Sequence, residues 1–368
     1  MRITALHPFV LLMFFMSILL SACKPVGDQK KLFSALEQRL DGYPEFFGVA
    51  LVGREGDPIY LSARGFRDPL KQTPADTGAV FELASVSKIF TSAVILQLVQ
   101  ERMIGLDDSL RRFFPELPYQ GITVRHLLSH TSGLPDYQAV MDSYWDKSRV
   151  AGNEECLEYL AKHHPPVAFR PGLKYEYSNT GYLILASIAE QVTSTPFRDL
   201  LRQRIFQPTG MANADIRMHE EKLKIPAMAW GFVNDSATGR YISADSLVSS
   251  NYTVWLGRRR GPGRVSATAT DLLRFDQAFF SGKILNDSIR SIALKEGILT
   301  DGSTTGYGLG WEVRKPGEIA GHSGNNPGYR TLFLHHSGKQ ECIVLLSNNA
   351  FEDLEAIAKE FGQQLGWY

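Results

Sequence analysis

Strand-like segments lie near both ends of this 368-residue chain, and helical segments fill the region between them. Two short apolar runs, 46–53 and 59–65, flank a Gly-Asp-Pro turn and predict a pair of strands. Four further runs predict strands near the C-terminus, at 309–313, 318–322, 331–335 and 342–346. The simplest architecture is an antiparallel sheet built from both termini and flanked by helices, an α/β chain of the α+β type.

This arrangement divides the chain into two parts. Residues 31–84 and about 226–368 are expected to form the α/β part, and about 85–225 an inserted, mostly helical part. Apolar spacing predicts helices at 31–40, 124–128, 156–163, 181–192, 197–205, 272–280 and about 352–365. Residues 268–271 read as a capping box, and 337–340 as the turn of a hairpin. The segment 226–262 shows no clear pattern.

The N-terminal residues are expected to be a targeting signal outside the fold. Residues 1–22 have a basic start and an apolar stretch too short for a membrane span, which is typical of a signal peptide. The ending Leu-Ser-Ala before Cys23 resembles a bacterial lipobox, so we expect a lipid on Cys23 and a tether at 23–30. Lys24 favours the outer membrane, facing the periplasm. Cys156 and Cys342 lie in different patterns, so two buried thiols are expected.

The charge balance argues against nucleic acid as a partner. Lys and Arg number 39, as do Asp and Glu, so no basic excess is available for a phosphate backbone. The one basic run, Arg258–Arg260, reads as a solvated loop. No cysteine–histidine cluster indicates zinc, and no organic cofactor is expected.

A serine and a lysine open the most apolar helical run, in the segment FELASVSKIF (81–90). Ser85 and Lys88 are three residues apart, which places them on one face of a helix. Apolar surroundings disfavour the charged form of an amine and lower its pKa. An uncharged Lys88 is then able to accept the hydroxyl proton of Ser85 and activate it as a nucleophile.

Two other segments carry polar groups that suit a cleft. Tyr177 and Asn179 are two residues apart on a loop that precedes a predicted helix. His322 stands at a strand end, and Gly324 follows it, where a missing side chain lets a substrate approach the backbone. Taken singly, each segment is also compatible with a purely structural role.

In this order and at these separations, the patterns S-x-x-K, Y-x-N and H-x-G resemble the serine β-lactamase/penicillin-recognising superfamily. The similarity is to class C β-lactamases and related D-peptidases and esterases, from about residue 31 to the C-terminus. Further segments resemble the family, namely LLSHTSGLPD (127–136), YEYSNTGY (175–182), SATATDL (266–272) and GYGLGW (306–311).

The resemblance implies a role for each matched residue. Ser85 would be the acylated nucleophile, and Lys88 would help to activate it. Tyr177 would be the general base for acylation and the proton donor to the leaving group. Asn179 would hold the substrate amide and orient Lys88. The backbone N–H groups of Ser85 and Asn325 would form the oxyanion hole.

One position departs from the β-lactamase pattern. His322 stands where those enzymes have the lysine of K-T-G, so a fixed cation for the β-lactam carboxylate is missing near neutral pH. D-peptidases and esterases of the superfamily commonly have histidine there. The sequence thus predicts a small-molecule or peptide substrate with an amide or ester bond, and leaves D-amino-acid peptides, esters and β-lactams open.

Three rival interpretations were weighed. Ser323 lies in a near match to G-x-S-x-G, but Asn325 replaces the last glycine. His126 and His130 have zinc-ligand spacing, but Leu127 replaces the glutamate that H-E-x-x-H requires. The third alternative is a protein of the same fold that binds or senses cell-wall peptides or β-lactams without turnover.

Overall fold

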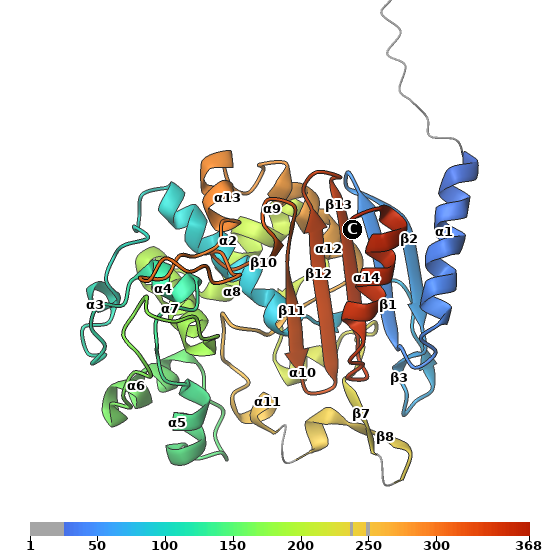
Figure 1. The fold of residues 1–368 in the computed structure, drawn as a ribbon. Coiled ribbons are helices and arrows are strands. Elements are labelled where there is room, and N and C mark those ends of the chain that lie inside the picture. The colour runs from blue at the N-terminus through green and yellow to red at the C-terminus, as the bar shows by residue number, and fades with distance from the viewer. Residues whose placement is uncertain (1–25, 236–237, 248–250) are drawn as a thin grey trace, which may run out of the picture.

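The computed structural model describes residues 26–235, 238–247 and 251–368. At its centre is a six-stranded antiparallel sheet in the order β10-β11-β12-β13-β1-β2 (Figure 1). Its strands are β1 (Gly48–Arg54), β2 (Asp57–Arg64), β10 (Glu312–Lys315), β11 (Ile319–Asn326), β12 (Tyr329–His336) and β13 (Glu341–Ser347). Strand β1 pairs with β13, with Gly48 opposite Ser347. The sheet is therefore built from both ends of the chain, which confirms the expected fold class.

Helices cover both faces of this sheet. Along β13, Ile343 and Leu345 belong to one apolar cluster, and Val344 and Leu346 belong to the other. Helices α1 (Val26–Asp41) and α14 (Leu354–Leu365) supply residues to the first cluster, and α12 (Ala269–Phe280) supplies residues to the second. Every residue of β13 is buried because both of its faces are packed.

The second cluster continues into the helical part of the molecule. Its central helix, α2 (Ser87–Gln100), is buried along most of its length and packs against α7 (Asn179–Thr193). The other helices of this part are α3 (Leu110–Phe113), α4 (Val124–Leu128), α5 (Tyr137–Tyr144), α6 (Asn153–His163), α8 (Phe197–Leu201), α9 (Gln207–Thr209) and α10 (His219–Lys222). A π-helical turn, Arg202–Phe206, joins α8 to α9.

Small strand pairs and short helices connect the two parts. They are β3 (Phe66–Asp68) with β4 (Thr73–Pro74), β5 (Phe81–Glu82) with β9 (Val265–Ala267) and β6 (Asp215–Ile216), and β7 (Phe232–Asp235) with β8 (Arg240–Ser243). The remaining helices are α11 (Tyr252–Trp255) and α13 (Asp287–Ala293). The segment 226–262, unassigned from the sequence, thus contains β7, β8 and α11.

Most expected elements are present, with shifted ends. The capping box at Thr268, the hairpin between β12 and β13 and the two free, buried cysteines are confirmed. Helix α1 begins at Val26, so residues 26–30 of the segment expected as a tether are helical, and the tether itself stays a prediction. The signal peptide and Cys23 lie outside the described residues. No helix of the described ranges has the length and hydropathy of a membrane span.

Candidate active site

Ser85 lies in a tight 3₁₀ turn, Ala84–Val86, that leads directly into helix α2. Ser85 therefore stands two residues before the first residue of α2, Ser87, and not within the α-helix. The preceding Ala84 has φ 48°, in the left-handed region that a side chain disfavours. Thr331 of β12 donates a hydrogen bond of 2.8 Å to the carbonyl of Leu83, which ties the turn to the sheet. Ser85 thus stands on a strained turn that the sheet holds in place.

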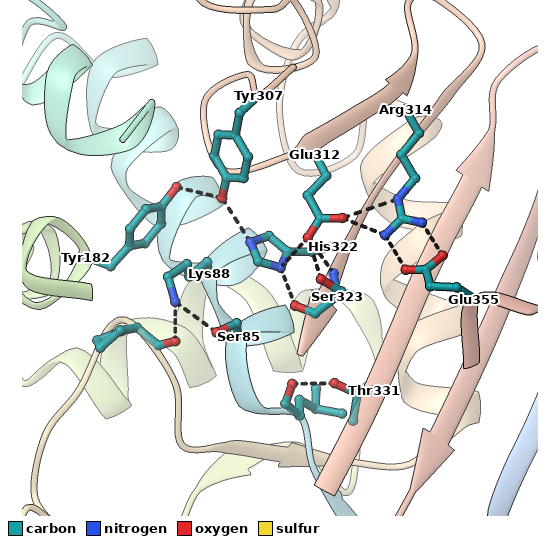
Figure 2. A network of polar contacts seen from close by, with 12 residues as sticks. Ser85, Lys88, Tyr182, Tyr307, Glu312, Arg314, His322, Ser323, Thr331 and Glu355 are labelled. Carbon is teal, nitrogen blue, oxygen red and sulfur yellow. Dashed lines mark hydrogen bonds and ion pairs between the residues drawn. The ribbon is translucent and has the colours of Figure 1, made fainter. Parts of the chain in front are cut away.

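Lys88 is fully buried and points its amine at Ser85 (Figure 2). The Lys88 Nζ lies 3.1 Å from the Ser85 hydroxyl, 2.8 Å from the Asn179 Oδ1 and 2.8 Å from the Pro262 carbonyl oxygen. Burial, followed by the nearby charge of Arg259, holds the pKa of Lys88 well below its usual value. Two of the three partners are oxygens that only accept hydrogen bonds. The amine donates to the Ser85 hydroxyl as well, and its lowered pKa favours the neutral form that is able to accept the Ser85 proton.

Tyr177 lies against the same pair of residues. Its ring centroid is 4.7 Å from the Lys88 Nζ, and the side chain is 42% exposed, which places it at the mouth of the site. Desolvation raises the pKa of the Tyr177 phenol, the charge of Glu312 adds to this, and a hydrogen bond with Ser85 opposes it. The phenol is therefore protonated near neutral pH and is suited to donate a proton. The structure brings Ser85, Lys88, Tyr177 and Asn179 together, as the motifs predict.

Asn179 and Asn325 line one pocket with Ser85. Asn179 is the first residue of α7, and the Ser178 hydroxyl caps this helix by accepting from the N–H of Gly181 at 3.2 Å. The Asn179 Oδ1 accepts a hydrogen bond from Lys88. The Asn179 Nδ2 makes no hydrogen bond with any of the described residues. That nitrogen is placed to donate to a substrate.

His322 belongs to a buried network that does not open into this pocket. The side chain is 1% exposed, its Nδ1 lies 2.6 Å from the Ser323 carbonyl, and its Nε2 lies 2.9 Å from the Tyr307 hydroxyl. A carbonyl only accepts, so the proton is on Nδ1, and Nε2 accepts from Tyr307. Both ring nitrogens are used within the protein. The expectation that His322 contacts the substrate directly is therefore not met in this geometry, because β11 points the ring inward.

Electrostatics keep His322 uncharged at neutral pH. Desolvation, together with the charge of Lys88, lowers its pKa to about 4 although Glu312 acts in the opposite direction. Burial alone would raise the pKa of Glu312, but His322, Arg314 and two hydrogen bonds from Ser323 lower it to about 2. Arg314 in turn pairs with Glu312 at 2.7 Å and with Glu355 of α14 (Figure 2). The site thus has a neutral imidazole where a β-lactamase carries a cation.

His130 is a site residue that the sequence did not reveal. It was expected to form hydrogen bonds within its own turn, but its Nδ1 accepts from the N–H of Ser178 at 3.0 Å, on the distant loop that carries Tyr177. Its ring lies 4.3 Å from that of Tyr177 and 4.6 Å from that of Tyr307. His130 therefore fixes the position of the phenol. The motif SHTSG was visible in the sequence, but its contact with Ser178 depends on the fold.

Gly324 is glycine for a reason other than the expected one. A Cβ at this position would lie 2.5 Å from the Leu83 carbonyl oxygen and 2.2 Å from the Thr331 Oγ1. The space that a side chain at position 324 would need is thus occupied by Leu83, at the start of the turn that carries Ser85. The missing side chain lets β11 run close beside Ser85.

The basic run Arg258–Arg260 is not a solvated loop, which corrects the sequence interpretation. Arg258 pairs with Glu155, and Arg260 pairs with Glu154 and Glu190. Arg259 is only 7% exposed and lines the pocket beside Ser85. The residues of one basic run therefore have different environments, which composition alone does not distinguish.

Comparisons with known proteins show the family to which the chain belongs. The chain matches the Beta-lactamase family over residues 34–364. It is 34% identical to Penicillin-binding protein 4* of Bacillus subtilis over 89% of this chain and 73% of that protein. It is 27% identical to a D-aminopeptidase of Cereibacter sphaeroides over 86% of this chain and 60% of that protein. The D-amino acid amidase of Ochrobactrum anthropi superposes with a TM-score of 0.73 at 25% identity, over 91% of this chain and 99% of that one. By these matches the chain belongs to the Beta-lactamase family, the class of serine hydrolase that its motifs predict.

Proposed function

We propose that this protein cleaves amide or ester bonds of small D-amino-acid substrates through an acyl-enzyme on Ser85. The observation that carries the proposal is the environment of Lys88, a buried amine with a lowered pKa whose Nζ lies 3.1 Å from the Ser85 hydroxyl. This is the arrangement that an activated serine nucleophile requires.

The contacts of Lys88 and Tyr177 support a specific set of proton transfers. Lys88 takes the Ser85 proton as the serine oxygen attacks the substrate carbonyl, and the backbone N–H groups of Ser85 and Asn325 receive the developing oxyanion. The raised pKa of Tyr177 makes it the proton donor to the departing amine or alkoxide, so we assign the base of the first step to Lys88. In the second step the Tyr177 phenolate takes a proton from the attacking water and Lys88 returns its proton to the departing Ser85 oxygen, so the acid product leaves and the site regains its starting protonation.

The substrate class follows from the relatives and from His322. A D-aminopeptidase and a D-amino acid amidase are among the matched proteins, and both names denote hydrolysis of amides of D-amino acids. A neutral, buried His322 supplies no fixed charge for a β-lactam carboxylate. Slow acylation by β-lactams, without efficient turnover, is therefore expected.

The test is turnover combined with intact-protein mass spectrometry. D-Alanine p-nitroanilide and a chromogenic ester are incubated with the protein and with Ser85→Ala. Product release together with an acyl adduct that peptide mapping places on Ser85 supports the hydrolase. An adduct that persists without product release would identify a binding or sensing protein instead, and undiminished turnover by Ser85→Ala would remove this serine from the mechanism.

We also propose where the enzyme acts. The lipobox-like sequence before Cys23 supports cleavage of residues 1–22 and lipid attachment to Cys23. Lys24 favours the outer membrane, so the hydrolase part would face the periplasm, where cell-wall peptides containing D-amino acids are accessible.

A further inference from the structure

Two arginines form part of the wall of the pocket beside Ser85. Arg259 is 7% exposed and Arg264 is 2% exposed, and both line the pocket that also contains Asn179. Buried guanidinium groups are costly unless a negative charge or good hydrogen-bond acceptors accompany them.

Arg264 has such a partner. Its Nη1 lies 3.7 Å from Glu82, a carboxylate that is itself 2% exposed. Glu82 also pairs with the buried Lys222 and accepts a hydrogen bond of 2.8 Å from the Asn326 amide. This one carboxylate therefore already serves two cations.

Arg259 has no such partner. Among the described residues, no carboxylate lies within ion-pair distance of it. Its side-chain contacts are the Tyr252 carbonyl at 3.5 Å and the Tyr252 ring, whose centroid lies 5.2 Å from the guanidinium carbon. The charge of Arg259 has a small lowering effect on the pKa of Asp136, whose pKa is raised mainly by burial. The Asp136 carboxylate does not pair with Arg259 and instead caps α5 by accepting from the N–H of Gln138 at 3.0 Å. The pocket therefore holds a buried positive charge whose N–H donors are largely unused.

The position of this charge relative to Ser85 indicates which part of a substrate would meet it. Tyr177, the proton donor to the leaving group, and His322 do not line this pocket, whereas Asn179 and Asn325 do. The leaving group must lie near the Tyr177 phenol that would protonate it. Because Tyr177 does not line the pocket that contains Arg259, we assign this pocket to the acyl part.

We propose that Arg259 binds a carboxylate carried by the acyl part of the substrate, so that this enzyme prefers acidic acyl groups. The proposal rests on the proposed acylation of Ser85. The planar guanidinium fork matches a carboxylate in a bidentate arrangement, and such charge-assisted hydrogen bonds are stronger than neutral ones. The bound carboxylate would supply the negative charge that the pocket lacks.

A matched pair of boronic acids tests the preference without needing turnover. The boronic acid analogue of D-alanine is acylated on nitrogen with either a succinyl or a butanoyl group, which have the same chain length but differ in the terminal carboxylate. Boron binds the serine oxygen in both compounds. We expect the succinyl compound to bind the wild-type protein at least about tenfold more tightly, measured by calorimetry, as charge-assisted hydrogen bonds imply.

The variants locate the effect. In Arg259→Gln the ratio of the two dissociation constants should fall to about two or less, and the ratio cancels any loss that affects both compounds equally. Arg260→Gln, which removes a neighbouring charge already paired with Glu154 and Glu190, should keep the wild-type ratio. In the wild-type protein the preference should also weaken as salt is raised, a measurement that does not depend on the folding of any variant.

Each outcome separates the two proposals. Equal affinity of the wild-type protein for both compounds would overturn the carboxylate site and leave the hydrolase intact. A preference that survives in Arg259→Gln would overturn the role of this arginine. Binding of neither compound would overturn the proposed nucleophile together with the inference built on it.

Discussion

The amine of Lys88 lies over the ring of Tyr177, 4.7 Å from its centroid, and its Nζ lies 3.1 Å from the Ser85 hydroxyl. Burial moves the pKa values of the two groups in opposite directions, down for the amine and up for the phenol. A protein that needs one proton acceptor and one proton donor near neutral pH obtains both from the same desolvated site.

Replacement of Lys88 tests the acceptor. Lys88→Ala should reduce kcat about 10²-fold or more on D-alanine p-nitroanilide, the scale of general base catalysis. Lys88→Arg should be equally impaired, because a guanidinium keeps the charge but does not release its proton. Substantial activity in Lys88→Arg would show that charge alone, and not proton transfer, is what position 88 supplies.

Tyr177→Phe tests the donor. Loss of the phenol should lower kcat about 10²-fold on an anilide, whose leaving group needs a proton. The loss should be much smaller on a p-nitrophenyl ester, whose leaving group departs without one. Steady-state rates on the two substrates measure this difference, and equal losses would argue against Tyr177 as the donor.

The pH dependence of stability should report His322. Its pKa is about 4 in the folded protein and near 6.5 when unfolded, so the unfolded chain binds the proton first as pH falls. The resulting stability is complete above about pH 6.5 and is lost progressively towards pH 4. Urea unfolding between pH 4.5 and 7 should show a slope that His322→Gln reduces by up to about 1.4 kcal/mol per pH unit.

The exposed His164, at the end of α6, provides the matched control for this series. His164→Asn should leave the slope as it is in the wild-type protein. An unchanged slope in His322→Gln would mean that the imidazole is not held neutral by its surroundings.

Gly324→Ala should disturb the nucleophile without touching a substrate. The added methyl group would lie 2.5 Å from the Leu83 carbonyl oxygen, so β11 or the Ser85 turn must move. We expect a loss of about 1–3 kcal/mol in unfolding free energy, typical of overpacking, and a fall in kcat of more than tenfold. Gly338→Ala in the β12–β13 hairpin, where the nearest atom is at 3.5 Å, should have little effect on kcat.

The lipid anchor is tested separately from catalysis. Cys23→Ser removes the sulfur that would carry the lipid, so the protein should leave the membrane fraction and appear in the soluble fraction with its specific activity unchanged. Fractionation followed by immunoblotting measures this. Continued membrane association of Cys23→Ser would contradict the lipobox interpretation.

The sequence predicted those parts of the site that lie in short, recognisable patterns. Ser85 lies in the turn that leads into the helix of Lys88, and Tyr177 and Asn179 flank the N-cap of another helix, so local spacing is enough to place each pair. His130, Tyr307 and Arg259 were missed because their roles depend on segments far apart in the chain. A basic run reads as solvated until the fold shows that one of its members is turned inward.

The same limit explains the errors in the fold. That strands from both chain ends form one sheet was predictable because the apolar runs lie there, but strand order and strand bounds depend on pairing partners. The strand expected at 309–313 begins at Glu312, since Gly310 has φ 95° and interrupts the extended backbone. The role of Gly324 was misinterpreted for a similar reason. The sequence indicates that some group approaches the backbone closely at this position, but it does not show that the group is the Leu83 carbonyl and not a substrate.

The pairing of β1 with β13 has a consequence for synthesis of the protein. Gly48 of β1 pairs with Ser347 of β13, about 300 residues later in the chain. During synthesis the β1–β2 hairpin is therefore made long before β13 exists. Until then, the free edge of β1 offers unpaired backbone groups to any neighbouring chain. A chain interrupted upstream of β13 would keep that edge exposed, and chaperone protection of the nascent N-terminal hairpin would matter more than for a protein whose sheet forms from adjacent strands.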